Sequence, residues 1–209
     1  MRYGELFKIV ELTQQAKAKI DFAIANTQFE WEAGNINDDN ISKLPDDHPF
    51  KRNYYDKDKQ KVRRVSEIGW IPDQNLRRMM LEMCFQVNSQ TEWNLNITAI
   101  EPVQFGIYPE GGKYDWHVDQ HGTSKTGEHR GNLIRKISMS YWLNDPEEYE
   151  GGELDLEIYK PGDEPRYESF RLKKNFAVFF QSDVWHRVRP VTKGVRKSLV
   201  AWFSGPAYT

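Results

Sequence analysis

Hydrophobic and polar positions change their period along the chain, and the change falls near residue 97. Before it, segment 13–25 carries apolar residues three or four positions apart, and Thr13 can accept a hydrogen bond from the first turn, so we predict a helix there. A second helix is expected to begin at Asp73, behind Pro72. The apolar residues that share its face are Leu76, Met80, Met83 and Val87.

After residue 97 the pattern becomes one of short strands separated by Gly, Pro and Asn turns. The predicted strands are 97–108, 113–119, 134–143, 153–159, 167–173, 176–181, 184–190 and 195–204. Eight strands of this kind fit a double-sheet jelly roll. Residues 32–64, rich in Asn, Asp, Lys and Pro, are expected to form long loops with one strand or a short hairpin.

Composition supports one globular domain and narrows the choice of partner. The chain has 209 residues, 38% of them hydrophobic, which is enough for a single core. A formal net charge of −2 offers no general attraction to a phosphate backbone, so nucleic acid is not the expected partner. Seven Lys/Arg in 51–64 and seven Asp/Glu in 145–157 are interpreted first as solvated loops.

Cysteine use and the absence of long apolar runs indicate the compartment. Cys84 is the only cysteine, so an intrachain disulfide is impossible and a secreted disulfide scaffold is excluded. The N-terminus lacks the order of a signal peptide, and no apolar run approaches the roughly 18 residues that would span a bilayer. We therefore expect a cytoplasmic protein without a membrane partner.

His117, Asp119 and His186 are the candidate metal ligands. An H-x-D spacing places both side chains on one side of an extended strand, and His186 follows a segment with strand-like composition. Two histidines and one carboxylate form the facial triad that leaves open positions on non-haem Fe(II). The remaining histidines lie beside a proline or in a polar, glycine-containing stretch and are not expected to be ligands: His48, His121 and His129.

Four further motifs surround this triad, and with it they resemble the Fe(II)/2-oxoglutarate-dependent dioxygenases of the prolyl 4-hydroxylase type. They are Tyr108-Pro109-Glu110-Gly111-Gly112-Lys113-Tyr114, Tyr141-Trp142-Leu143-Asn144, Gly151-Gly152-Glu153-Leu154 and Arg196-Lys197-Ser198. The resemblance implies a mainly β chain with supporting helices (α+β), folded as a double-stranded β-helix. It also divides the single domain 1–209 into helical support and substrate loops (1–96) and a catalytic core (97–204).

The cofactors follow from the same resemblance. It implies Fe(II), 2-oxoglutarate and dioxygen, with ascorbate as an additional candidate. Arg196 is the expected partner of the distal carboxylate of 2-oxoglutarate, because a planar guanidinium holds a carboxylate through two parallel hydrogen bonds. Tyr108 and Ser198 are expected to contact the co-substrate beside it.

Three aromatic residues are weaker candidates for the pocket wall. Tyr114 lies in the first motif, and Trp202 falls six residues after Arg196 and so on the same strand face. Trp142 stands where related protein hydroxylases carry a Tyr that reaches the co-substrate, and an indole offers only an N–H.

The resemblance favours a peptidyl-proline substrate that is hydroxylated with release of succinate and CO2. Segments 48–65 and 120–133 are candidate lids over an extended, proline-containing peptide. A free amino acid or small metabolite remains an alternative, as does a non-catalytic jelly-roll binding module with a vestigial metal site. A nucleic-acid demethylase is disfavoured, because that group carries a second Arg where this chain has Trp202. The sequence does not indicate an oligomeric state.

Overall fold

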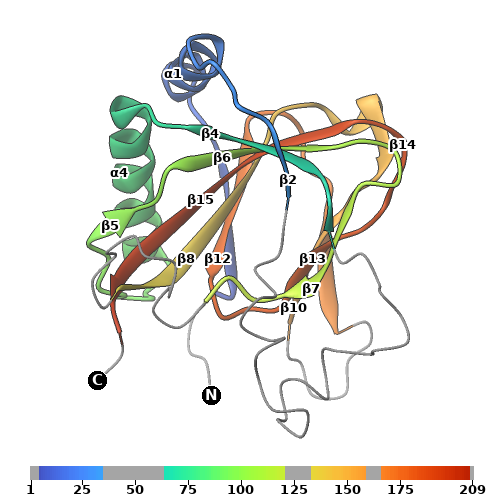
Figure 1. Cartoon of the computed structure of the whole chain (residues 1–209). Helices are drawn as coiled ribbons and strands as arrows, with labels where there is room; N and C mark the ends of the chain where they lie inside the picture. The colour runs from blue at the N-terminus through green and yellow to red at the C-terminus, as the bar shows by residue number, and fades with distance from the viewer. Residues whose placement is uncertain (1–4, 35–63, 121–132, 159–165, 208–209) are drawn as a thin grey trace, which may run out of the picture.

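The computed structural model describes residues 5–34, 64–120, 133–158 and 166–207. These ranges contain the helices α1 (Gln14–Ala25) and α4 (Gln74–Gln90) and the 3-10 turn η1 (Pro146–Glu148), and the remaining elements are strands (Figure 1). The strands are β1 (Phe7–Glu11), β2 (Glu32–Ala33), β3 (Arg64–Val65), β4 (Glu67–Ile71), β5 (Ala99–Ile100), β6 (Val103–Tyr108), β7 (Lys113–His117), β8 (Leu133–Trp142), β9 (Tyr149–Gly151), β10 (Leu154–Glu157), β11 (Tyr167–Phe170), β12 (Phe176–Gln181), β13 (His186–Val188), β14 (Val191–Gly194) and β15 (Arg196–Pro206).

The described strands form a large sheet, a smaller sheet and a two-stranded ribbon. The large sheet has the order β1-β12-β8-β15-β6-β4-β2, with β5 paired to β15, and the smaller sheet has the order β11-β10-β13-β7-β3. Strands β9 and β14 form the ribbon. All of the strand pairs are antiparallel.

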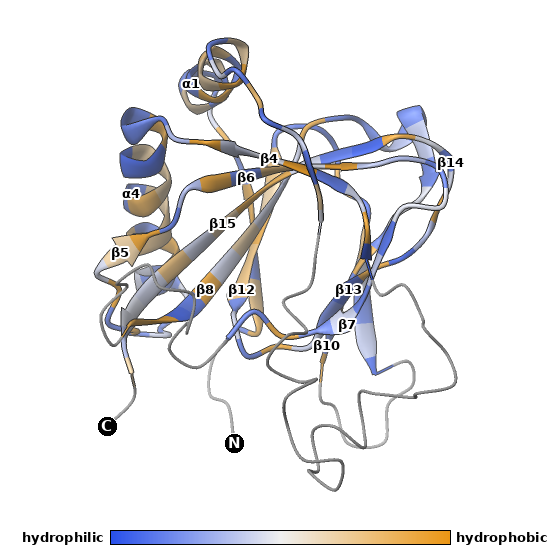
Figure 2. Cartoon of the chain, viewed as in Figure 1, coloured by the Kyte–Doolittle hydropathy of each residue, from blue (hydrophilic) through white to orange (hydrophobic). Residues whose placement is uncertain are grey.

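The two helices cover one face of the large sheet, and alternation along its strands divides the core into two clusters. In β8 the side chains of Ile137, Met139 and Tyr141 pack toward the helices, whereas Trp142 belongs to the cluster on the other face. Figure 2 shows hydrophobic and hydrophilic residues mixed along α4, in keeping with a helix that buries one face only. The second cluster is the one that borders the candidate site.

Both predicted helix starts are confirmed. The Thr13 side chain accepts a hydrogen bond from the Ala16 backbone N–H at 3.2 Å, and Asp73 accepts one from Leu76 at 2.6 Å. Met83 lies at the border of the predicted core face and is only partly buried. The buried residues of α4 are Leu76, Met79, Met80, Cys84 and Val87. Neither helix in the described ranges is long and apolar enough to cross a membrane.

Residues before 97 contain more strand than the pattern predicted. Strand β4 escaped prediction because Gly69 lies inside it and Pro72 follows it, and both residues usually interrupt strands. Gly69 is needed there, since a Cβ would lie 2.6 Å from the ring of Phe29. Strand β1 is short, half exposed and separated from its partner β12 by most of the chain, so its local pattern carries little signal.

The ribbon β9–β14 was also missed, because its glycines look like turn residues. Gly151 and Gly194 have φ values of 71° and 75°, a region that favours glycine. Pro102 interrupts the predicted strand 97–108 between β5 and β6. The predicted lids 48–65 and 120–133, together with His48, His121 and His129, lie almost entirely outside the described residues.

A β-bulge in β8 changes the direction of one charged side chain. Ile137 pairs with Phe203 and Arg135 pairs with Ser204, so Lys136 is the extra residue of the bulge. The bulge brings Arg135 onto the same face as Trp202, where its Cζ lies 3.9 Å from the indole centroid.

Candidate active site

His117, Asp119 and His186 come together between the two sheets. Their ligand atoms lie within 4.8 Å of one another, and all three residues are buried. His117 ends β7 and His186 begins β13, and these two residues are paired across the two strands. Asp119 lies beyond the end of β7 rather than in it, so the predicted placement of the pair on one strand is wrong. A backbone hydrogen bond from Asp119 to the Ser182 carbonyl holds it instead.

Hydrogen bonds of the two imidazoles determine which nitrogen faces the centre. Nδ1 of His117 lies 2.8 Å from the Asp115 carbonyl, and Nδ1 of His186 lies 3.0 Å from the Val184 carbonyl. A carbonyl only accepts, so each Nδ1 donates, and in the neutral form of either ring Nε2 is the nitrogen that carries the lone pair. The two Nε2 atoms lie 3.7 and 3.4 Å from the carboxylate oxygens of Asp119.

Two serines support Asp119 from behind. The Ser138 hydroxyl donates to Oδ2 of Asp119 at 2.7 Å, and its oxygen lies 2.9 Å from the Ser182 hydroxyl. Both serines are fully buried. Neither was expected from the sequence, since a serine in a strand has no local signal that distinguishes it from a packing residue.

Protonation favours metal binding by this group. Burial lowers the pKa of His117 well below its ordinary value, and the nearby His186 lowers it further. Burial alone would raise the pKa of Asp119, but interactions with His186 and then His117 lower it well below the ordinary range. A neutral imidazole and an ionised carboxylate are the forms that bind a divalent metal.

Arg196, the first residue of β15, lies in a pocket lined by aromatic rings. Its side chain is 1% exposed, and its Cζ lies 5.2 Å from the Tyr108 ring and 5.4 Å from the Trp142 ring. Nη1 donates to the Ser198 hydroxyl at 2.9 Å, while Nε has no partner within the described structure. The sequence predicted Arg196, Tyr108 and Ser198 as neighbours of the co-substrate and Trp142 as a weaker candidate for the pocket wall, and the fold brings the four side chains together.

Tyr149 joins this pocket and was not predicted. It is 2% exposed. Burial raises its pKa, and the charge of Arg196 lowers the pKa by a smaller amount. Its sequence context, next to Gly151 and Gly152 after an acidic run, looked like a loop. Tyr149 lies near Arg196 because it is the first residue of β9, in the ribbon β9–β14 that the sequence pattern did not predict.

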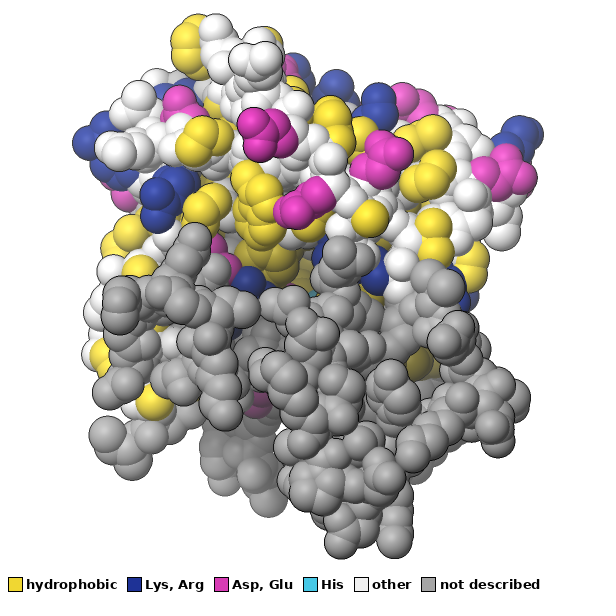
Figure 3. All heavy atoms as spheres, viewed as in Figure 1, with side chains coloured by type: hydrophobic (Ala, Val, Ile, Leu, Met, Phe, Trp, Pro, Cys, Tyr) yellow, Lys and Arg dark blue, Asp and Glu magenta, His cyan; other side chains and the backbone are white. Residues whose placement is uncertain are grey.

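Aromatic and basic side chains extend from the triad. The Tyr114 ring stacks on His117 with centroids 3.5 Å apart, and Cζ of Arg64 lies 4.6 Å from the Tyr114 centroid. Cζ of Arg135 lies over the Trp202 ring, and the ring of the partly exposed Trp70 is tilted against Trp202 with the centroids 6.3 Å apart. Figure 3 shows hydrophobic side chains gathered in a hollow in the middle of this face, with acidic side chains above them.

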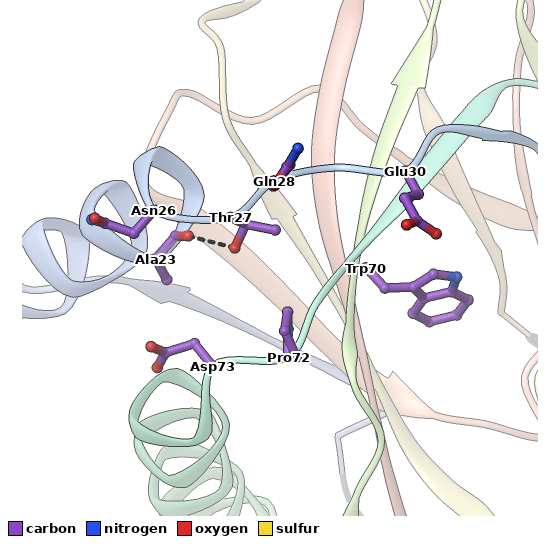
Figure 4. Close-up of a pocket in the computed structure, with 8 residues that line it drawn as sticks. All are labelled: Ala23, Asn26, Thr27, Gln28, Glu30, Trp70, Pro72 and Asp73. Carbon is purple, nitrogen blue, oxygen red and sulfur yellow. Dashed lines mark hydrogen bonds between the residues drawn. The ribbon is translucent and has the colours of Figure 1, made fainter.

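A separate surface cleft lies where the end of α1 approaches the start of α4 (Figure 4). Its volume is about 400 Å³, and the Thr27 hydroxyl on its wall donates to the Ala23 carbonyl at 2.7 Å. Trp70 is shared between this cleft and the aromatic group around Trp202. The cleft contains none of the predicted site residues.

Comparison with known sequences finds similar proteins for the core of the chain. Residues 103–204 match the profile of the 2OG-Fe(II) oxygenase superfamily. A PKHD-type hydroxylase of Acidovorax ebreus is 34% identical over 104 residues, and one of Parvibaculum lavamentivorans is 37% identical over 102 residues. These alignments cover 50% and 48% of this chain. The chain spans only 43% and 42% of the lengths of these relatives.

Solved structures share the fold over most of the chain. A prolyl hydroxylase of Trichoplax adhaerens, in complex with a hypoxia inducible factor peptide fragment, has a TM-score of 0.57 at 19% identity, covering 95% of this chain and 83% of that one. A Pseudomonas putida prolyl-4-hydroxylase has a TM-score of 0.52 at 21% identity, with coverages of 92% and 100%. These likenesses confirm the predicted double-stranded β-helix.

Proposed function

We propose that this chain, whose residues 103–204 belong to the 2OG-Fe(II) oxygenase superfamily, hydroxylates an unactivated C–H group with Fe(II), 2-oxoglutarate and dioxygen. The observation that carries the proposal is the buried His117/Asp119/His186 group, with its ligand atoms within 4.8 Å. Its donor set fits Fe(II): two imidazole nitrogens and one carboxylate leave several coordination positions for exchangeable ligands.

The second pocket supports 2-oxoglutarate as the co-substrate. A guanidinium that is 1% exposed and has no carboxylate partner in the described structure is costly to bury. A bound dicarboxylate would compensate that charge, and Arg196 can hold its distal end by two parallel hydrogen bonds. Ser198 fixes the guanidinium orientation through Nη1, and Tyr108 forms one aromatic wall.

In this mechanism the chain's own residues bind, orient and shield. When bound, Fe(II) with 2-oxoglutarate and dioxygen supplies the oxidation that replaces a hydrogen by hydroxyl, with succinate and CO2 as co-products. His117 and His186 present Nε2 because each Nδ1 is fixed by a backbone carbonyl. Ser138 holds the Asp119 carboxylate, and the Tyr114 and Phe180 rings against the imidazoles exclude water from the ligand atoms.

We further propose a peptidyl-proline substrate. The likeness to prolyl hydroxylases supports it, and so does the partly exposed ring of Trp70 next to Trp202, because an indole face packs well against an apolar ring. Arg135 donates to Glu101 through Nε and Nη2, which leaves its Nη1 to donate to a carbonyl group of an extended peptide. Residues 1–209 are proposed to act as one cytoplasmic domain, with ascorbate as an auxiliary reductant.

The proposal is tested by succinate formation. Protein loaded with Fe(II) under nitrogen is exposed to oxygen and 2-oxoglutarate, with and without proline-containing peptides and with and without ascorbate. We expect peptide-stimulated turnover in the wild type, and a loss of more than about a hundredfold in His186→Ala and Arg196→Ala. Arg78→Ala, which changes an exposed arginine on α4, is the matched control and should keep wild-type activity.

Each other outcome has a defined meaning. Turnover that no peptide stimulates would support the oxygenase assignment and exclude the tested peptides as substrates. A free amino acid or small metabolite would then be the next substrate to test. Full activity of His186→Ala would contradict the assignment of the metal ligands. A protein that binds neither Fe(II) nor 2-oxoglutarate would favour the alternative of a non-catalytic binding module.

A further inference from the structure

Three buried hydrogen-bond donors in the Arg196 pocket have no acceptor. They are Nε of Arg196, the indole N–H of Trp142 and the hydroxyl of Tyr149, and each is without a hydrogen-bond partner among the described residues. Trp142 is fully buried and Tyr149 is 2% exposed, so ordinary surface solvation cannot satisfy them. Buried donors of this kind are rare in folded proteins, and a group of three calls for a shared acceptor.

The three donors belong to one pocket. Cζ of Arg196 lies 5.4 Å from the Trp142 ring. Burial raises the pKa of Tyr149, and the charge of Arg196 and then the indole N–H of Trp142 lower it in part, so both groups lie near the Tyr149 oxygen. Gly152 connects the other two: a Cβ at this glycine would lie 3.0 Å from Cδ of Arg196 and 3.3 Å from Cε2 of Tyr149. The glycine therefore lets the tyrosine ring and the arginine stem pack closely at the same point.

The acceptor that suits this pocket is a carboxylate. It carries the negative charge that Arg196 lacks, and its two oxygens offer about four lone-pair positions. A planar guanidinium directs at most two parallel N–H groups at one carboxylate, and Arg196 also donates to Ser198, so further lone-pair positions stay open for other donors. An indole N–H and a phenol hydroxyl are suitable additional donors. Burial raises the pKa of Tyr149, so its hydroxyl stays protonated and able to donate at neutral pH.

We propose that the Tyr149 hydroxyl and the Trp142 indole N–H bind the distal carboxylate of 2-oxoglutarate together with Arg196. This inference rests on the proposed function and adds to it two residues that set the selectivity for a dicarboxylate. A 2-oxo acid without the second carboxylate would leave the donors unsatisfied and would bind more weakly.

Binding rather than turnover tests this assignment. Protein loaded with Fe(II) under nitrogen is titrated calorimetrically with 2-oxoglutarate and with 2-oxobutyrate, in which a hydrogen replaces the distal carboxylate. Tyr149→Phe removes only the hydroxyl, and we expect its Kd for 2-oxoglutarate to rise about tenfold. Its Kd for 2-oxobutyrate should stay unchanged. Trp142→Phe should shift selectivity in the same direction, and a variant that loses the fold is identified by circular dichroism.

Tyr141→Phe is the matched control. It also removes a buried tyrosine hydroxyl, but one that donates to Asn175 on the helix side of β8, so both Kd values should equal those of the wild type. Equal 2-oxoglutarate affinity in Tyr149→Phe and wild type would overturn the inference, as would equal weakening for both ligands. A wild-type protein that binds no 2-oxoglutarate would overturn the proposed function itself.

Discussion

Ser138 contacts a candidate metal ligand directly, and the effect of its hydroxyl on metal binding can be measured separately. It donates to Oδ2 of Asp119 at 2.7 Å and so fixes the direction of the other oxygen. We expect Ser138→Ala to weaken metal binding about tenfold, because partners that orient a ligand commonly contribute 10- to 100-fold in affinity. Titration of the apoprotein with Co(II), followed by its visible absorption, measures this directly.

Ser140→Ala is the control for that measurement. Ser140 lies two residues farther along β8, is similarly buried and pairs with Val178 and Val200 rather than lying behind Asp119. Its removal should leave Co(II) affinity within about twofold of the wild type. Equal losses in the two variants would mean that general packing of β8, not the contact with Asp119, sets the affinity.

Cys84 shows how burial determines reactivity at the residue scale. The thiol is fully buried on α4, and desolvation raises its pKa, so the nucleophilic thiolate is suppressed. We expect a thiol reagent to label less than about a tenth of the native protein in an hour at pH 8, and all of it in denaturant. Rapid labelling of native protein would contradict the packing of α4 on the sheet.

The site residues that the sequence could indicate are of types that have few other uses inside a strand-rich core. His117, Asp119, His186 and Arg196 were predicted because charged and imidazole side chains in apolar strands are costly, and their spacing repeats a known pattern. Tyr149 could not be found this way. An aromatic residue is usual in a core, and only its unsatisfied hydroxyl, visible in the folded chain, distinguishes it.

At the scale of elements, the buried carboxylate of Asp155 on β10 binds a side chain of β13, the strand that carries His186. Asp155 on β10 is fully buried on the outer face of the smaller sheet, where it accepts from Nε of Arg187 at 2.7 Å and from Nε of Arg189 at 2.8 Å. The Ser169 hydroxyl donates to its other oxygen. These contacts join β10, β11 and the region of β13 across the hydrogen-bonded ladder.

Removal of that carboxylate should therefore destabilise the fold. We expect Asp155→Ala to lower the free energy of unfolding by about 2–4 kcal/mol, because two arginines that are only one-third exposed lose their shared partner. The midpoint of urea unfolding reports this change. Glu150→Ala breaks an exposed ion pair with Lys193 and should cost less than about 1 kcal/mol. Similar urea midpoints for the two variants would show that the buried Asp155 contributes no more to stability than the exposed Glu150.

The elements that could be predicted are those with a strong local signal. Thr13 and Asp73 provide caps, and the helices after them have a 3.6-residue period, so their starts were correct. The pairing of β4 with β6, and of β9 with β14, depends on contacts between distant segments and on glycines that only the tertiary structure requires. The hydrophobic and polar pattern within one segment does not indicate which distant strand the segment pairs with.

For the whole molecule, buried tyrosines predict a loss of stability in alkali. Burial, and to a lesser degree the charge of Asp21, raises the pKa of Tyr141 to about 12. The unfolded phenol ionises near pH 10, so the stabilisation is complete below that pH and is lost as the pH rises toward 12, up to about 3 kcal/mol. Urea midpoints measured from about pH 9 to 11.5 should fall accordingly.

Tyr141→Phe separates this effect from general alkaline damage. The variant loses the hydrogen bond to Asn175, about 1 kcal/mol at every pH, but it should show a shallower decline above pH 10. Parallel curves for variant and wild type would assign the decline to other groups.

Strand β1 pairs with β12, and almost the whole length of the chain separates Phe7 from its partner Phe180. During synthesis β1 leaves the ribosome before β8 and β12, so it has no sheet to join until these two strands have appeared. Contacts of such long range slow folding, because the cost of closing the loop precedes the gain from pairing. Although β1 is made long before β12, it is thus fixed in the sheet only after β12, and until then the edge of β12 is open to pairing with another chain.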